Sequence, residues 1–254
     1  MKVYAIAINT FKEVIRDKIF YSLLFFAVLL VGASVLFSML SIGGTAKIIE
    51  DLSLGAISLF GVIIAIFVGI GLVSKELEKK TIYTIISKPI SRYEFLLGKY
   101  LGLSLTLLVY VSVMSACFLI TLYVFTGVLG WALMPAVLLA YVELLVVTAS
   151  AILFSTFSTP TLSATYALAL YVIGHLTGDL KGLADKKGAE GLKGLLDFLY
   201  YFLPNLENFN IKGQVVHGVA VSGGYIAMSV LYGMLYVAGL LAVSVLVFQR
   251  RNFK

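Results

Sequence analysis

Residues 75–100 read KELEKKTIYTIISKPISRYEFLLGKY and form the only long charged segment in the first 178 residues. They carry six of the nineteen basic residues and lie between two strongly apolar segments. Ile82, Ile85 and Ile86 recur at helical spacing with charged residues on the other faces, which predicts an amphipathic helix in the first half. Pro89 ends that helix, because proline lacks the backbone N–H that a continuing turn needs.

A capping box follows the proline, at Ser91 and Glu94. In this motif the serine side chain accepts from the backbone N–H three residues on, and the glutamate side chain reaches back to the serine N–H. A second helix is therefore predicted to begin here and to continue into the next apolar segment. The order of helix, proline break and capped helix is typical of a docking element. A solvated loop between two membrane helices is the simpler alternative for a basic segment.

The composition is that of an integral membrane protein. The 254 residues are 61% hydrophobic and 13% charged, whereas a soluble domain has about 45–50% apolar and about 25% charged residues. The net charge of +6 fits basic loops that face the cytoplasm and anionic lipid. No basic run with interleaved aromatic residues lies outside the apolar segments, so we expect no nucleic-acid binding. We predict an all-α membrane protein with six transmembrane helices. Their expected bounds are 19–42, 53–73, 101–126, 132–157, 162–178 and 225–248.

The N-terminal residues 1–18 precede the first span of what we expect to be one transmembrane domain over residues 1–254. Ile8, Phe11 and Ile15 recur at helical spacing, and polar residues occupy another face. This pattern predicts an amphipathic helix that lies in the membrane interface. A simple membrane anchor would show the same pattern.

Two other regions interrupt the apolar segments. Residues 43–51 are expected to form a short polar loop. Residues 179–224 are too long for a featureless loop, and leucines at helical spacing end at Pro204. We expect short external helices here before the last span, one ending at the proline and a second around residues 215–221.

The distribution of basic residues predicts the orientation. Thirteen of the nineteen fall in the N-terminal segment, residues 75–100 and the C-terminal tail, and six fall in the loops on the other side. Acidic residues are distributed in the opposite sense, with five on the first side and seven on the second. Because basic loops stay inside, both termini of this multi-pass protein are expected in the cytoplasm.

The charged segment at residues 75–100 resembles the cytoplasmic segment of ABC-2 type ABC-transporter permeases. The resemblance lies in the pattern E-x-E-x-x-T-(x)7-P-I-S-R-x-E-F-x-x-G-K-x-x-G, which continues to Gly102. The subgroup that it resembles is linked to the maturation of multicopper enzymes and nitrous oxide reductase. The matching positions are Glu76, Glu78, Thr81, Pro89, Ile90, Ser91, Arg92, Glu94, Phe95, Gly98, Lys99 and Gly102. The resemblance implies a permease in the cell membrane that pairs as a homodimer, surrounded by the lipid bilayer. It also implies a separate P-loop ATPase subunit that binds ATP and Mg²⁺, so that this chain itself binds no cofactor.

In that family the segment is the coupling element that contacts the ATPase, and residues 1–18 resemble its N-terminal connecting helix. The residues that we expect to contribute to coupling are Glu76, Glu78, Thr81, Ile82, Pro89, Ser91, Arg92 and Glu94. No G-x-x-x-x-G-K-[ST] motif and no hydrolase signature occurs in the sequence, so we expect no enzymatic activity of this chain. The single cysteine, Cys117, excludes a disulfide within the chain and a thiolate metal cluster.

Glu143 is the one charged residue well inside a predicted span. A carboxylate at that depth is costly and usually faces a cavity or a partner, so Glu143 is expected to line a translocation path or a dimer interface. The alternative is a protonated glutamate bonded to a neighbouring hydroxyl such as that of Ser112 or Thr148. A lone membrane carboxylate cannot form an aspartyl-protease dyad, and we expect His175 to be a polar residue at a helix end near the outer surface.

These observations favour the permease subunit of an ATP-driven ABC transporter, which we expect to be of the exporter type. An ATP-independent secondary transporter or channel is the first alternative. Such a protein usually carries several charged residues along its spans for ion coupling, and one glutamate in six spans is a poor match. A membrane assembly subunit that serves enzyme maturation without transport is the second alternative.

Overall fold

The computed structural model describes residues 2–40, 44–78, 91–178, 194, 200 and 202–250. Within these residues the regular elements are helices and no strand occurs, which confirms the all-α prediction for this part of the chain. The elements, in chain order, are α1 (Lys2–Ile15), α2 (Lys18–Met39), α3 (Thr45–Ile63), η1 (Ile64–Val68), α4 (Gly69–Glu78), α6 (Arg92–Thr126), η2 (Trp131–Leu133), α7 (Met134–Phe157), α8 (Pro160–His175), η3 (Leu206–Phe209), α11 (Lys212–Val216) and α12 (Gly223–Arg250).

Five helical stretches of the described part are long and apolar enough to cross a membrane. They are Lys18–Met39, Thr45–Leu72, Arg92–Thr126, Trp131–Phe157 and Gly223–Arg250. The span predicted at 162–178 corresponds to α8, which has 16 residues. At 1.5 Å per residue α8 is about 24 Å long, shorter than a hydrocarbon core of about 30 Å. A multi-pass membrane protein is therefore supported, and six complete crossings stay a prediction.

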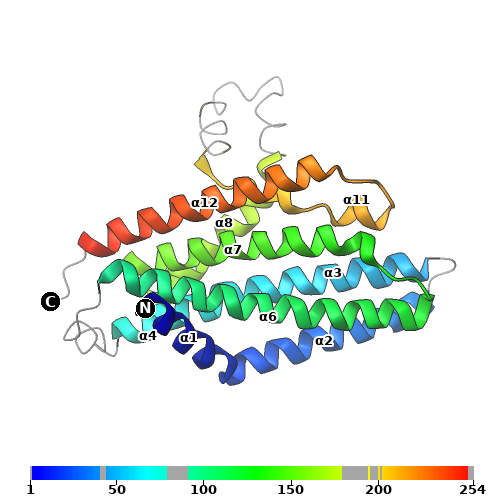
Figure 1. Cartoon of the computed structure of the whole chain (residues 1–254), viewed down its shortest axis with the longest axis horizontal. Helices are drawn as coiled ribbons and strands as arrows, with labels where there is room; N and C mark the ends of the chain where they lie inside the picture. The colour runs from blue at the N-terminus through cyan, green and yellow to red at the C-terminus, as the bar shows by residue number, and fades with distance from the viewer. Residues whose placement is uncertain are drawn as a thin grey trace.

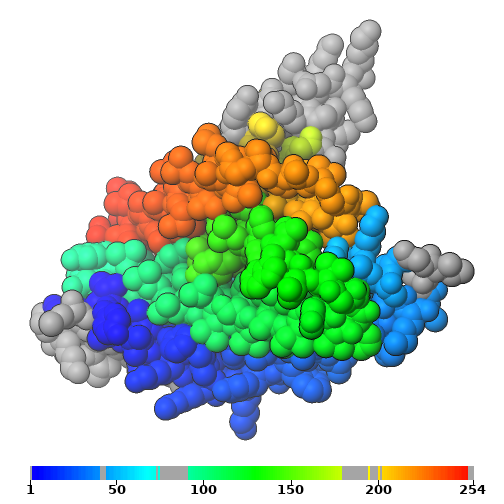
Figure 2. Space-filling model, turned by 45° about the vertical axis from the view of Figure 1, so that its right-hand side comes forward, coloured from blue at the N-terminus to red at the C-terminus, as the bar shows by residue number. Residues whose placement is uncertain are grey.

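The long helices lie side by side along one axis (Figure 1). One end of this bundle gathers α1, the end of α4, the start of α6 and the C-terminal end of α12. The opposite end holds the connections from α2 to α3, from α6 to α7 and from α11 to α12. Figure 2 shows α1 on the surface beside the first turns of α6, with α12 above them. Both ends of the described chain thus lie at the same end of the bundle.

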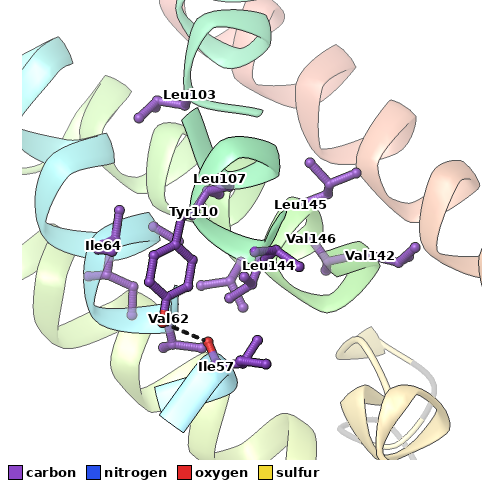
Figure 3. Packing of buried hydrophobic residues seen from close by; sticks show 14 of the residues in the cluster. Ile57, Val62, Ile64, Leu103, Leu107, Tyr110, Val142, Leu144, Leu145 and Val146 are labelled. Carbon is purple, nitrogen blue, oxygen red and sulfur yellow. Dashed lines mark hydrogen bonds between the residues drawn. The ribbon is translucent and has the colours of Figure 1, made fainter. Parts of the chain in front are cut away.

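Helix α7 is the central element of the bundle. Of its most apolar stretch, 78% of the residues are buried inside the chain, against 22% for α12, which lies at the periphery. Tyr110 of α6 enters the core beside Leu144 of α7 and Ile64 (Figure 3). Its hydroxyl donates to the backbone carbonyls of Ala56 and Ile57 in α3, at 3.2 Å each. This contact fixes α6 against α3 within the apolar core.

Residues 45–78 form one unbroken helical stretch that contains a π-helical turn, η1, between α3 and α4. The predicted loop at 43–51 is therefore wrong over residues 45–51, which form the first two turns of α3. The loop was predicted because this stretch carries polar side chains. Ile49 is fully buried while Asp51 is exposed, so these turns are amphipathic and continue the helix beyond its apolar part.

Helix α1 confirms the predicted N-terminal helix, but its buried face differs from the expected one. Ala7, Thr10 and Val14 are buried, whereas the predicted apolar residues Ile8, Phe11 and Ile15 are half-buried. Small side chains let a helix approach its neighbour closely, and here they face α6. Its position in the membrane interface stays a prediction.

The segment 179–224, predicted to be external, is described mainly in its second half. The helix predicted to end at Pro204 lies almost entirely outside the described residues. Two short elements follow the proline, η3 and α11. Helix α11 begins at Lys212, earlier than the piece predicted around 215–221. It ends at Val216, shortly before Gly218, which takes a left-handed conformation with φ at 71° of the kind that follows a helix end.

Candidate functional site

The structure describes the two ends of the predicted coupling segment. Helix α4 ends at Glu78, and α6 begins at Arg92. Glu76 and Glu78 lie in the last turn of α4, at the end of the bundle where both termini lie (Figure 1). The predicted coupling residues Thr81, Ile82 and Pro89 lie outside the described residues, as does the helix expected between them. Contacts of any of these residues with an ATPase stay predictions.

The capping box that the sequence predicts begins α6. Ser91 has extended backbone angles, and its N–H donates to Glu94 Oε2 at 2.8 Å. The reciprocal contact from the Ser91 side chain to the Glu94 N–H is looser, because Ser91 Oγ has no hydrogen bond of ordinary geometry. The carboxylate in the first turn also complements the positive end of the helix dipole. This local chemistry fixes the point at which α6 leaves the coupling segment.

Arg92 connects the start of α6 to the end of α12. Its Nη1 donates to the carbonyls of Phe248 at 2.8 Å and Gln249 at 2.9 Å. The Phe95 and Phe248 rings stack beside this contact, with centroids 6.2 Å apart and planes 16° apart. The last carbonyls of a helix have no partner within the helix and carry partial negative charge. Arg92, expected from the sequence to contact an ATPase, thus already binds the C-terminal end of α12.

Helix α1 approaches α6 closely at Gly98 and Gly102. A Cβ atom on Gly98 would lie 2.6 Å from Ile6 Cβ, and one on Gly102 would lie 2.6 Å from Ala7 O. Two glycines four residues apart form the small-residue face that lets membrane helices pack backbone to backbone. The G-K-x-x-G part of the sequence motif is therefore the surface on which α1 rests.

Lys99 lies between these two glycines and is almost completely buried, with 1% of its side chain exposed. Its Nζ lies 3.5 Å from Glu13 Oε2 of α1 and 5.8 Å from the centre of the Phe95 ring. A buried ammonium needs such partners, because desolvation of an unpaired charge is costly. The ion pair adds a polar tie to the close packing of α1 on α6.

Glu143 is the tenth residue of α7 and is wholly buried, with none of its surface exposed. His175, the last residue of α8, places Nε2 3.4 Å from Glu143 Oε1. Neither carboxylate oxygen accepts a hydrogen bond of ordinary geometry from the described residues. The expected hydroxyl partners are wrong, because Ser112 donates to Leu108 O at 2.7 Å and Thr148 donates to Leu144 O at 2.7 Å.

Other polar groups approach the same carboxylate from three elements. Tyr171 lies one turn before His175 on α8, and its hydroxyl faces Glu143. Glu207 of η3 and Lys212 of α11 act on Glu143 electrostatically. Glu143 thus faces the interior of a single chain, where α7, α8 and the segment before α12 meet. Its role in a translocation path stays a prediction.

The segment before α12, residues 205–216 with η3 and α11, is held in place by hydroxyl groups of α12. The backbone N–H of Asn205 donates to the Tyr232 hydroxyl at 2.9 Å. Tyr225 and Ser229 donate to the carbonyl of Asn208 at 3.0 and 3.2 Å. Phe209 is buried against Gly233 of α12. This segment therefore covers one side of the group formed by Glu143, Tyr171 and His175.

Two apolar grooves flank α12. The larger has a volume of about 790 Å³ and lies between α12 and the α7–α8 hairpin, where Phe154, Leu170 and Leu240 contribute to its walls. The other, of about 710 Å³, lies between α12 and the start of α6. Among the described residues, no charged side chain lines either groove. Such surfaces suit the hydrocarbon chains of a bilayer.

The pairing of Glu143 with His175 was missed by our sequence reasoning, although a signal was present. Helices α7 and α8 form a tight hairpin, because α7 ends at Phe157 and α8 begins at Pro160. Glu143 lies 14 residues before the end of α7, and His175 lies 15 residues after the start of α8. Residues at equal distances from such a turn lie at the same level, so the two polar residues had to approach each other.

The sequence profile of the family described as ABC-2 family transporter protein matches residues 4–253. The match covers nearly the whole chain, and the chain belongs to this family. A search of curated proteins gives no match. ABC-2 permeases are the membrane components of ABC transporters and generally work with a separate ATPase subunit. The ABC-2 resemblance of residues 75–100 is therefore confirmed at the level of the family.

Proposed function

We propose that this chain is the permease subunit of an exporter-type ABC transporter and that each copy docks a separate P-loop ATPase. Two copies pair in the membrane, and ATP with Mg²⁺ binds in the partner subunits. Both termini face the cytoplasm in this arrangement, and the chain crosses the membrane six times. The coupling residues are those of the segment 75–100 together with α1.

The gathering of the predicted coupling elements at one end of the bundle supports this proposal above all. Helix α1, the end of α4 and the start of α6 lie there together with the end of α12 (Figure 1). A subunit docked at this end would contact the two helices that flank residues 79–90. This end also carries basic residues, such as Lys2 and Lys12 of α1 and Arg250, the last residue of α12, as expected for a cytoplasmic surface.

Two routes lead from this end into the membrane. Helix α6 has 35 residues, so it is about 52 Å long and extends beyond a hydrocarbon core of about 30 Å. Movement of its first turns is passed to α1 through Gly98 and Gly102 and to α12 through Arg92. Helix α4 leads into the π-helical turn η1, and π-helical turns occur frequently at functional sites.

Charge reversal at the end of α4 tests the proposal. We expect that the native complex, purified in mild detergent, contains one P-loop ATPase per permease. Glu76→Lys combined with Glu78→Lys should remove most of that ATPase, because it reverses two charges at the docking end. Glu50→Lys combined with Asp51→Lys is the matched control, since it reverses two charges at the opposite end of the same helical stretch.

Two outcomes of this purification contradict the proposal. The first is equal recovery of the ATPase with both pairs of substitutions, which would remove residues 75–100 from the docking surface. The second is a chain that purifies alone and transports its cargo during ATP depletion. That result would favour the secondary transporter, which the family assignment and the single intramembrane carboxylate do not favour.

The subgroup linked to maturation of multicopper enzymes and nitrous oxide reductase gives a narrower form of the proposal. It is supported by the pattern that residues 76–102 share with that subgroup. In this form the complex serves the maturation of an enzyme outside the cytoplasm, either by moving a cargo or by relaying force without transport. Growth under conditions that require such an enzyme, with its metal content measured in a strain that lacks this chain, tests the narrower form.

A further inference from the structure

Glu143 is a buried carboxylate that lies beside a histidine. It is wholly buried, both of its oxygens lack ordinary hydrogen bonds, and one of them lies 3.4 Å from His175 Nε2. Buried carboxylates are normally satisfied by several hydrogen bonds. An ionised carboxylate without them is very costly in a buried, apolar environment. Something small must therefore compensate the charge of Glu143.

We propose that Glu143 and His175 form a binding site for one proton inside the α7–α8 hairpin. The proton lies between Glu143 Oε1 and His175 Nε2, either as a neutral carboxyl group beside a neutral imidazole or as a carboxylate beside an imidazolium. Both forms hold the same number of protons, and both avoid an isolated buried charge. No other atom has to enter the site.

The second nitrogen of His175 defines which proton is exchangeable. Nδ1 lies 3.1 Å from the carbonyl oxygen of Tyr171. A carbonyl only accepts hydrogen bonds, so we assign the hydrogen of the neutral ring to Nδ1. Nε2 then faces Glu143 with a free lone pair, ready to accept the carboxyl proton. One position on the line between the two side chains is left for the exchangeable proton.

The remaining charged groups around the site favour a proton over a metal cation. Among the described residues, those that face Glu143 are Tyr171 and His175 of α8, Glu207 of η3 and Lys212 of α11. The charges of Glu207 and Lys212 are opposite and offset each other. A metal site usually has three or four protein ligands, and no group of three or more His, Cys, Asp and Glu side chains that could hold a metal occurs in the described residues, whereas a proton needs only this pair.

His175 also supplies the route by which the proton reaches the site. Its side chain is 22% exposed, whereas that of Glu143 is completely buried. The imidazole therefore exchanges protons with water on one side and with the carboxylate on the other. A movement that separates α8 from α7 would break the pair and release the proton, because each group would then be solvated separately.

Infrared difference spectroscopy of the full-length chain in lipid nanodiscs tests this site. Spectra recorded at neutral pH in H₂O and D₂O report a protonated carboxyl group, whereas exposed carboxylates are ionised there because their usual pKa is about 4. With His175→Gln the proton can reside only on Glu143. We expect a carboxyl band in His175→Gln that is at least as strong as that of the wild type and that is absent when Glu143→Gln is added.

His217→Gln is the matched control for the loss of an imidazole. His217 places its Nδ1 2.8 Å from the carbonyl of Gly213, four residues earlier, as His175 does with Tyr171. His217 is exposed, and no carboxylate within 4 Å faces it in the described part. We expect His217→Gln to give the wild-type spectrum. Size-exclusion elution and circular dichroism check that each variant is folded.

The proposal is overturned if His175→Gln shows no carboxyl band that depends on Glu143, or if His217→Gln alters the band as much as His175→Gln does. The measurement needs neither an ATPase nor a cargo. The proton site therefore goes beyond the proposed transport function, and failure of one leaves the other to be judged separately.

Discussion

Replacement of Gly102 by alanine tests whether α1 depends on its close approach to α6. The added Cβ would lie 2.6 Å from the Ala7 carbonyl oxygen and 2.6 Å from Thr10 Cβ. Ordinary contacts between such atoms are about 3.5–4.0 Å, so α1 has to move outward by about 1 Å. A change of side-chain rotamer does not relieve the clash, because the carbonyl oxygen belongs to the backbone of α1.

The magnitude follows from two opposing effects. Overpacking of this kind costs about 1–3 kcal/mol, and a gap of 0.5–1 Å along the rest of the interface forfeits about a quarter to a half of each dispersion contact. Alanine favours the helix over glycine by about 0.5–1 kcal/mol, which offsets part of the loss. Gly55→Ala is the matched control, because nothing lies within 4 Å of its Cβ position and only the gain in helix propensity remains.

Hydrogen–deuterium exchange of a peptide from α1, measured by mass spectrometry in nanodiscs, reports this local loss. The steric cost of about 1–3 kcal/mol corresponds to roughly 5- to 150-fold faster exchange in Gly102→Ala than in Gly55→Ala. Equal exchange of α1 in the two variants would refute the reasoning. It would mean that α1 is not held by the glycine pair at 98 and 102.

Three further substitutions test other contacts of the bundle. Arg92→Ala removes two charge-assisted hydrogen bonds and should cost about 1–3 kcal/mol at the end of α12; exchange of the last turn of α12 measures this loss, and Arg92→Lys should restore part of it. In Gly233→Ala the added Cβ would clash with Val142 of α7 and lie 3.1 Å from Phe209 of η3, so the substitution should lower the thermal unfolding temperature. Gly239→Ala should not lower it, because nothing lies within 4 Å of its Cβ position. Tyr110→Phe removes the hydroxyl that joins α6 to α3 and should cost about 0.5–1.5 kcal/mol in detergent unfolding; the exposed Tyr123→Phe should cost nothing measurable.

The sequence predicted best the features whose causes are local. The start of α6 follows from the capping box at Ser91 and Glu94, and the break between α7 and α8 falls between the predicted spans 132–157 and 162–178. Each depends on a few consecutive residues, so the linear pattern contains the whole cause. The prediction of a loop at residues 45–51 was wrong for a related reason. Their polarity suggested a loop, but a helix that extends past its apolar part carries polar residues too.

The contacts of Arg92 and Glu143 could not be derived in the same way. Arg92 binds carbonyls 156 and 157 residues away in the chain, and no local pattern specifies that meeting. The partner of Glu143 was accessible in principle from the hairpin register. The sequence analysis instead offered hydroxyls of α6 and α7 as partners of Glu143, because side-chain hydroxyls in membrane helices are common hydrogen-bond donors. They bond to carbonyls of their own helices, as serine and threonine often do.

The described contacts divide the segment 75–100 into two functional halves. After Pro89, each of the charged residues has a partner inside the chain: Arg92 holds the end of α12, Glu94 caps α6, and Lys99 pairs with α1. Their charges are committed to assembling one end of the bundle. We therefore expect an ATPase to be recognised through residues before the proline, whereas Arg92, Glu94 and Lys99 hold α12, α6 and α1 together at this end of the bundle. Reversal of the charge of Glu94 should then destabilise the start of α6, whereas reversal of the charge of Glu76 should remove the ATPase from a folded permease. If both variants lose the ATPase and both stay folded, this division is contradicted.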